Sequence, residues 1–211
     1  MRLRKVKGAL ETIESFPNIV IPNPTSYKGK WNTLFKNDNP IYLEIGMGKG
    51  KFIIEHATRN PDINYLGLEV EESVLVRAVE KLEDNPLPNL FLIHIDAFLV
   101  NDIFEKGEIT KLFLNFSDPW PKTRHIKRRL TCNKILQEYC NILKKDGTIE
   151  FKTDNRKLFE YSLQEFVLNK LPIEDLSLNL HEDKEDIVTT EYEDKFVAKG
   201  NVIYFIEVRN A

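Results

Sequence analysis

The chain has 211 residues, of which 42% are hydrophobic and 30% are charged, so it can bury a core of ordinary size without disulfides or structural metals. No apolar run approaches the roughly 20 residues that a membrane span needs, and the basic N-terminus lacks the apolar core of a signal peptide. The net charge is −3, but it is unevenly distributed: residues 1–9 carry four cations and residues 119–131 carry five, with no acid in either segment. The rest of the chain therefore carries a charge of −12, and this distribution favours the binding of a polyanion to the two basic segments.

The sequence predicts a basic N-terminal arm and helical lead-in over residues 1–39, followed by a single α/β domain over residues 40–211. In the domain, strand-like and helical runs alternate, which is typical of a parallel sheet with helices on both faces. The predicted strands cover residues 41–45, 63–70, 90–95, 111–116, 148–152 and 202–208. The predicted helices cover residues 52–60, 73–82, 131–143 and 158–168, with a short helical insert at 190–199. Asp146-Gly147 is predicted to stop the third of these helices.

Two cysteines lie in the third predicted helix, eight residues apart at Cys132 and Cys140. That separation is too long for a disulfide on one helix and does not match a metal-ligand spacing. The sequence therefore predicts no bridge and no metal site, and it favours the reducing cytoplasm. It leaves open whether the chain is a monomer or a homodimer.

A glycine loop follows the first predicted strand, with glycines at Gly46, Gly48 and Gly50. Backbone N–H groups at such a strand-to-helix turn can approach a ligand closely. A dinucleotide fingerprint has its third glycine one residue later, so the spacing disfavours a nicotinamide dehydrogenase and suits a cofactor without pyrophosphate. A glycine loop by itself is equally consistent with a structural turn.

Acidic residues stand at the ends of three successive predicted strands, at Glu44, Glu69 and Asp96. Glu44 can accept from a cationic amino group, Glu69 can bind both ribose hydroxyls, and Asp96 can accept from an exocyclic amine. Any one of them could instead cap a helix. Their joint placement predicts a ligand at the carboxyl edge of the sheet, and a cationic adenosine compound, S-adenosylmethionine, fits better than a phosphate-rich one.

The segment after the fourth predicted strand combines a carboxylate, an aromatic ring and cations. Asp118 lies at the end of the strand, and Pro119 and Pro121 stiffen the turn that contains Trp120. A base can stack on Trp120, although a core role for this ring is the plainer alternative. A basic block follows, which consists of Arg124, His125, Ile126, Lys127, Arg128 and Arg129. It is predicted to bind along RNA phosphates, although a solvated surface would explain these charges as well.

With these motifs in view, the chain resembles the bacterial tRNA (guanine-N7)-methyltransferases over nearly its full length. The matching motifs are Glu-Ile-Gly-Met-Gly-Lys-Gly at 44–50, Phe-Ser-Asp-Pro-Trp-Pro-Lys at 116–122, Arg-His-Ile-Lys-Arg-Arg at 124–129, Thr-Asp-Asn at 153–155 and Thr-Glu-Tyr-Glu at 190–193. The glycine loop is shared by class I methyltransferases generally, whereas the 116–122 and 190–193 motifs are specific. Thr123 and Val6 depart from the residues common in the family, lysine and proline, and both positions concern RNA affinity or arm geometry.

The resemblance implies a Rossmann-like class I methyltransferase fold, in which a seven-stranded, mostly parallel sheet ends in an antiparallel strand and carries helices on both faces. It implies that S-adenosylmethionine contacts Glu44, Glu69, Asp96 and Asp118, and that a guanine in the tRNA variable loop is the target. The residues implied in substrate binding are Lys122, Asp154, Thr190, Glu191, Tyr192 and Glu193.

Guanine N7 has a lone pair and no proton, so methylation there needs alignment rather than a general base. We assign Asp118 the catalytic role of favouring the positive charge that develops on the base. Acceptors for the N1–H and N2 amine of guanine are expected from Asp154, Thr190, Glu191 and Glu193, with Lys122 donating to O6. Two alternatives stay open. The first is an exocyclic-amine methyltransferase, because the Asp/Asn-Pro-Pro-aromatic turn of such enzymes is similar to the turn at Asp118. The second is a non-catalytic RNA-binding protein with a relict cofactor fold.

Overall fold

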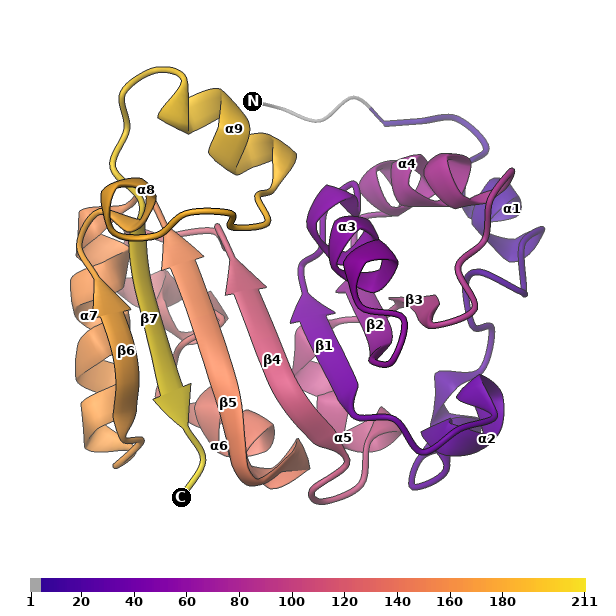
Figure 1. Cartoon of the computed structure of the whole chain (residues 1–211), viewed down its shortest axis with the longest axis horizontal. Coiled ribbons are helices and arrows are strands. Elements are labelled where there is room, and N and C mark those ends of the chain that lie inside the picture. The colour runs from indigo at the N-terminus through magenta and orange to yellow at the C-terminus, as the bar shows by residue number, and fades with distance from the viewer. Residues whose placement is uncertain (1–4) are drawn as a thin grey trace.

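Seven strands form one mixed sheet in the order β3-β2-β1-β4-β5-β7-β6 in the computed structural model, which describes residues 5–211 (Figure 1). The strands are β1 (Ile41–Ile45), β2 (Asn64–Glu69), β3 (Leu90–His94), β4 (Ile109–Asn115), β5 (Leu143–Thr153), β6 (Ile173–Ser177) and β7 (Tyr204–Arg209). β1 to β5 pair in parallel, whereas β7 is antiparallel to both β5 and β6. The prediction of a mostly parallel sheet whose last strand is antiparallel is confirmed.

Helices pack on both faces of the sheet. Contacts place α1, α3 and α4 on one face and α5, α6 and α7 on the other, while α9 lies beyond the carboxyl ends of β4 and β5 (Figure 1). The α-helices are α1 (Ala9–Glu14), α2 (Trp31–Phe35), α3 (Lys51–Arg59), α4 (Glu72–Leu82), α5 (Val100–Ile103), α6 (Asn133–Ile142), α7 (Arg156–Leu168), α8 (Leu180–Asp183) and α9 (Glu191–Val197). Three 3₁₀ turns are η1 (Pro24–Tyr27), η2 (Ala97–Leu99) and η3 (Thr123–Arg128).

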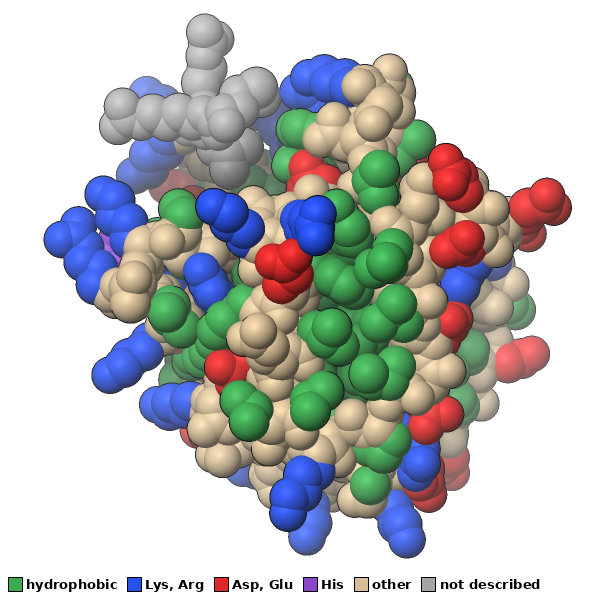
Figure 2. Space-filling model, turned by 90° about the vertical axis from the view of Figure 1, so that its left-hand side faces the viewer, with side chains coloured by type: hydrophobic (Ala, Val, Ile, Leu, Met, Phe, Trp, Pro, Cys, Tyr) green, Lys and Arg blue, Asp and Glu red, His purple; other side chains and the backbone are tan. Residues whose placement is uncertain are grey.

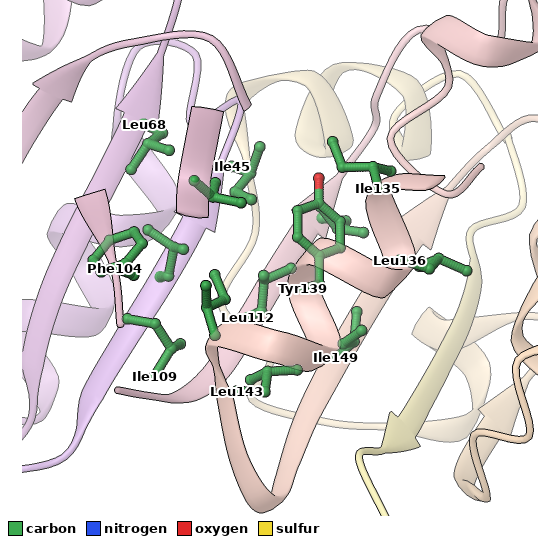
Figure 3. Close-up of a cluster of buried hydrophobic side chains, with 14 of the residues drawn as sticks. Ile45, Leu68, Phe104, Ile109, Leu112, Ile135, Leu136, Tyr139, Leu143 and Ile149 are labelled. Carbon is green, nitrogen blue, oxygen red and sulfur yellow. The ribbon is translucent and has the colours of Figure 1, made fainter. Parts of the chain in front are cut away.

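Alternating strand residues supply the two cores. Ile45, Leu112 and Ile149 face α6, where they meet Ile135 and Tyr139 (Figure 3). These five side chains are at most 2% exposed, as expected for strands that are covered on both sides. On the opposite face, residues of α3 and α4 pack around a second buried cluster. The central strands are therefore clamped between two layers, and the positions of their carboxyl ends are fixed.

One predicted boundary is wrong. α6 ends at Ile142, and Asp146-Gly147 lies inside β5 rather than at the end of a helix. A Cβ on Gly147 would lie 2.9 Å from the carbonyl oxygen of Thr110 on β4, so the glycine permits a close approach between two strands at an irregularity in their register. Turn chemistry at a strand bend and at a helix stop uses the same residues, which is why the pattern misled.

The prediction from residue patterns also missed β6, because this strand borders an acidic stretch that reads as a solvated face. Its acids are paired with neighbouring segments: Glu174 bonds to Arg209 on β7, and Asp175 bonds to Lys184. β6 is an edge strand with exposed apolar residues, so neither alternation nor a buried run marks it in the sequence.

The lead-in before β1 packs against the sheet. Trp31 is fully buried, and its Nε1 donates to the carbonyl oxygen of Ile103 at 2.9 Å. The backbone N–H of Val6 donates to Ser73 Oγ at the start of α4. Arg2 and Arg4, which belong to the predicted basic arm, lie outside the described residues, and the division at residue 39 stays a prediction.

The outer face formed by α7 and β6 is apolar. Figure 2 shows hydrophobic side chains gathered there, with Lys and Arg mainly toward the margins. The exposed hydrophobic residues of this region are Val167, Leu168, Ile173, Leu176 and Leu178. A polyanion would find few cations at the centre of this face. Within residues 5–211, no helix has the length and apolar character needed to cross a bilayer.

Candidate active site

A pocket of about 500 Å³ opens at the carboxyl edge of the parallel strands. It brings together the predicted Glu69 at the end of β2, Asp96 after β3 and Asp118 after β4. Its other lining residues are Ile45, Gly46, Leu68, Val70, Glu71, Ile95, Ala97, Phe98, Asn115, Phe116, Ser117, Trp120, Arg128 and Leu130. Carboxylates, apolar side chains and an aromatic ring thus surround one cavity where doubly wound sheets bind their ligands.

The glycine loop forms one wall of this pocket. Gly46 and Gly48 have φ values of +72° and +60°, and a Cβ on either would meet no atom within 4 Å. Both glycines therefore serve the left-handed backbone conformation, and they leave open space beside the loop. The N–H of Gly48 donates to Glu69 Oε2 at 3.0 Å, which joins the loop to the carboxylate at the end of β2.

Glu69 is held by the backbone around it. Its Oε1 accepts from the N–H groups of Val70 and Glu71, both at 2.9 Å, in addition to the bond from Gly48. Burial raises the pKa of Glu69, whereas these three backbone donors act to lower it. The carboxylate is thereby fixed in direction, and an Oε atom that already accepts one bond can still accept from a ribose hydroxyl.

Glu44 does not line the pocket but lies beneath the glycine loop. Its side chain is 1% exposed, Oε1 accepts from Asn115 Nδ2 at 2.8 Å, and Oε2 has no hydrogen-bond partner. Burial raises the pKa of Glu44 to about 8. A buried carboxyl group with an unsatisfied oxygen is costly, so this position is suited to a cationic or hydrogen-bond-donating ligand group.

The unsatisfied atoms around the pocket test whether a cationic adenosine ligand fits. Within the described residues, Ser117 Oγ and Asn115 Oδ1 are also buried without a partner, and both residues line the pocket. The pocket thus offers unpaired acceptors beside three carboxylates, and its walls include Leu68, Ile95 and Phe98, against which an adenine ring can pack. This donor-poor, acidic and apolar set fits S-adenosylmethionine and disfavours a ligand rich in phosphate.

The turn after β4 has an unusual backbone. Phe116 and Trp120 have φ values of +52° and +40°, a region that bulky residues rarely adopt. Arg129 fixes the turn, because its Nε donates to Pro119 O at 2.9 Å and its Nη2 donates to Trp120 O at 3.2 Å. Strain of this kind persists where surrounding contacts determine the geometry, as at functional sites. Asp118 is thereby held, exposed, at the pocket rim.

The basic block divides by role. Arg128 lines the pocket with its guanidinium 4.9 Å from the Trp120 ring centroid, and His125 lies edge-on to the same ring at 5.6 Å. Arg129 is directed into the turn rather than toward solvent. In the described part of the chain, the remaining cations of this region, Lys122, Arg124 and Lys127, are exposed and make no salt bridge. That all six residues track RNA stays a prediction, while Arg129 is engaged with the turn.

The 190–193 motif forms the start of α9. Thr190 caps this helix in a capping box with Glu193, in which Glu193 N donates to Thr190 Oγ1 at 3.0 Å. Glu193 is fully buried, its Oε2 accepts from Lys152 Nζ at 2.8 Å, and its Oε1 lies 3.0 Å from His181 Nε2. The side chains of Thr190 and Glu193 thus build the start of the helix, and their contact with guanine stays a prediction.

Two other members of the expected substrate site, Tyr192 and Asp154, are in contact with each other. Tyr192 packs on Phe116 at 5.0 Å between ring centroids, and its hydroxyl donates to Asp154 at 3.3 Å. Glu191 pairs with Lys81, whose Nζ also donates to the Lys49 carbonyl oxygen in the glycine loop at 2.8 Å. α9 is thus joined both to the pocket wall and to the glycine loop.

Asn115 and Lys152 were not among the predicted site residues, and Arg129 was predicted to contact RNA rather than to support the turn. Lys152 carried a partial signal, since it lies in the predicted strand 148–152 and a lysine that is buried in a strand needs a partner. Within residues 5–211, no group of three or more His, Cys, Asp or Glu side chains is placed to hold a metal ion.

Known proteins resemble this chain closely in sequence. Residues 38–206 match the family model described as "Putative methyltransferase". A tRNA (guanine-N(7)-)-methyltransferase of Geobacillus sp. is 54% identical over 210 residues, covering 99% of this chain and 96% of the relative. The protein of the same name from Bacillus subtilis is 51% identical over 209 residues, covering 99% and 98%, respectively.

Solved structures share the fold at much lower identity. An antibiotic-related methyltransferase superposes with a TM-score of 0.64 at 19% identity, covering 86% of this chain and 92% of that one. The 16S rRNA methyltransferase KamB superposes with a TM-score of 0.66 at 12% identity and the same coverage. Since half of its residues are shared with full-length relatives and its fold is that of methyltransferases, this chain belongs to the tRNA (guanine-N(7)-)-methyltransferase family.

Proposed function

We propose that this chain transfers the methyl group of S-adenosylmethionine to N7 of a guanine in the variable loop of tRNA. The observation that carries the proposal is the pocket itself. It joins Glu69, Asp96 and Asp118 from three strand ends and borders Trp120 and Arg128. Near-full-length relatives named for guanine-N7 methylation of tRNA support the same reaction.

The residues present would hold the cofactor in a defined direction. Glu69 would bind the ribose hydroxyls, and Asp96, which follows the end of the adjacent strand β3, would accept from the adenine amine. Glu44 Oε2, together with Ser117 and Asn115, offers acceptors toward the amino acid end. When bound, S-adenosylmethionine supplies an electrophilic methyl group on a positively charged sulfur.

The protein contributes alignment and electrostatics to the transfer. No general base is required at N7, so acceleration comes from holding the base in line and excluding water. Asp118 lies at the pocket rim, on a turn fixed by Arg129, where its negative charge would favour the cation that develops on guanine. Trp120 beside it offers a face on which a base can stack.

Guanine would be recognised at the neighbouring end of β5. Asp154 accepts weak bonds of 3.3 to 3.4 Å from Tyr192 and Asn201, and its carboxylate retains acceptor capacity for the N1–H and N2 amine. Lys122 can donate to O6. An adenine presents an unprotonated N1 to the same carboxylate, so the site would reject it. Arg124 and Lys127 would bind phosphates of the flanking loop.

The test is to incubate the protein with methyl-labelled S-adenosylmethionine and unmodified tRNA, digest the tRNA and identify the labelled nucleoside. 7-Methylguanosine from the variable loop is the expected product. A product methylated on an exocyclic amine would identify the first rival, an exocyclic-amine methyltransferase. Binding of tRNA without any transfer, and without cofactor affinity, would identify the non-catalytic rival.

A further inference from the structure

A buried polar row crosses three adjacent strands beneath the pocket. Its members are Glu44 on β1, Asn115 on β4 and Lys152 on β5, all on the face of the sheet that carries α3. Glu44 bonds to Asn115 at 2.8 Å, and Asn115 is the register partner of Lys152. The row therefore connects the strand beneath the glycine loop with the strand from which Asp154 follows.

Lys152 links this row to α9. Its Nζ donates to Glu193 Oε2 at 2.8 Å and to the Val188 carbonyl oxygen at 3.1 Å, and it lies 4.7 Å from the ring centroid of Phe52 in α3. Lys152 is 1% exposed and Glu193 is fully buried. One ammonium group thus contacts the segment before α9, the helix itself and the first turn of α3.

A buried ion pair of this kind is not explained by stability alone. Well-packed apolar side chains of similar volume often give equal or greater stability, because both charges lose their hydration. An ion pair whose partners are further hydrogen-bonded can instead specify one geometry. Both carboxylate oxygens of Glu193 are engaged, one by Lys152 and the other by His181, so the first turn of α9 is held in one position against the sheet.

The position of α9 matters because this helix borders the pocket. Tyr192 packs against Phe116, which lines the pocket, and it bonds to Asp154. A displacement of α9 would move this ring relative to the end of β4 and would disturb its hydrogen bond to Asp154. Reactions that depend on alignment are sensitive to displacements of about 1 Å, which can cost roughly 100-fold in rate.

We propose that Lys152 is a positioning residue for methyl transfer, which holds α9 through Glu193 so that the guanine site stays in register with the cofactor pocket. The inference rests on the proposed function, in which residues of α9 contribute to the guanine site. It assigns Glu193 to the support of the helix and not to contact with the base.

The test compares Lys152→Met, Glu193→Gln and the double variant with wild type. The control is Lys111→Met, which breaks an ion pair of Lys111 with Glu150 and Glu207 on the same face without touching α9. The measurements are KM for tRNA, kcat, cofactor Kd by calorimetry, Tm, and amide hydrogen exchange of residues 191–197 against that of α3.

Each single variant is expected to lower kcat and raise KM for tRNA, so that kcat/KM falls about 10-fold or more, and to speed exchange in α9, with a smaller change in cofactor Kd. The double variant removes both charges, so its Tm should recover, while KM stays high because the bond to Val188 is also removed. Lys111→Met should leave KM for tRNA within about twofold of wild type.

Two results would overturn the inference. One is an unchanged KM for tRNA and unchanged α9 exchange in folded Lys152→Met. The other is recovery of KM together with Tm in the double variant, which would indicate a purely structural pair. If wild type methylates no tRNA, the proposed function fails, yet the exchange of α9 in the variants still decides whether Lys152 holds this helix.

Discussion

The guanidinium of Arg129 bonds to the carbonyl oxygens of Pro119 and Trp120, while its carbon lies 4.3 Å from the ring centroid of Tyr161. Arg129, which the sequence places at the end of a predicted RNA-binding segment, therefore stabilises the turn that contains Asp118. Arg124 and Lys127 in the same segment are exposed, so variants can test the support of the turn and the proposed RNA contact separately.

Arg129→Met should weaken cofactor binding and tRNA methylation together, because the turn loses two hydrogen bonds to a charged donor, each contributing about 1.5 to 3 kcal/mol. Calorimetric cofactor Kd and methylation rate measure the effect. Arg124→Met removes an exposed cation of the same block and should change only tRNA binding. An Arg129→Met protein with wild-type cofactor affinity would show that the turn is held by other contacts.

The exposed cations should carry the salt-dependent part of tRNA binding. Replacing both Arg124 and Lys127 by glutamine is expected to weaken binding and to lower the slope of log K against log salt by about 0.7 to 0.9 for each phosphate that the variant no longer neutralises. Lys144 and Lys145, at the opposite edge of the sheet, provide a matched double glutamine control. Equal slopes for the two double variants would place the RNA elsewhere.

Glu44 should make the unliganded protein less stable as the pH rises. Burial raises the pKa of Glu44 to about 8, so between its unfolded pKa of 4.5 and pH 8 the unfolded state has lost a proton that the folded state keeps. The free energy of unfolding then falls by about 1.4 kcal/mol per pH unit from this group over that window, and levels off above it. Denaturant titrations from pH 5 to pH 8 measure the slope.

Glu44→Gln should remove this slope and make the protein more stable than wild type at pH 8, at the expense of cofactor affinity. Glu83→Gln, which changes an exposed carboxylate, should leave the slope as it is. If Glu44→Gln kept the wild-type pH dependence, the buried carboxyl group would not be its source.

Asp118 should contribute chiefly to the chemical step. Both Asp118→Asn and Asp118→Ala are expected to lower kcat/KM for tRNA methylation by about 100-fold, since each removes the negative charge at the pocket rim. Steady-state rates with unmodified tRNA provide the measurement, and Asp84→Asn, an exposed substitution outside the pocket, is the control. Turnover at the wild-type rate in both Asp118 variants would exclude the role.

Much of the fold was predictable, because its signals are local. Apolar runs such as 111–116 mark buried parallel strands, and helical spacing marks segments such as 73–82, so the order of elements follows from periodicity. β6 was not predictable from its residues, because an edge strand with acidic residues paired to Arg209 and Lys184 has neither signal.

The candidate site was likewise predictable from the sequence only in part. Acids at successive strand ends predict a shared edge, since parallel strands bring their carboxyl ends together, and the pocket does combine Glu69, Asp96 and Asp118. Whether a given charge faces a ligand or the protein depends on side-chain direction. Thr190 and Glu193 were expected to face guanine, yet they build α9.

The sequence by itself determined the alternation of strands and helices, the glycine loop and the set of acids and cations around one edge, because these follow from residue type and spacing along the chain. The tertiary structure decided which charges are available. The side chains of Arg129 and Lys152 donate hydrogen bonds to partners between 9 and 41 residues away, and no local pattern records such pairings. Burial then made Glu44 a carboxyl group that keeps its proton at neutral pH, a property set by the residues packed around it rather than by its own type.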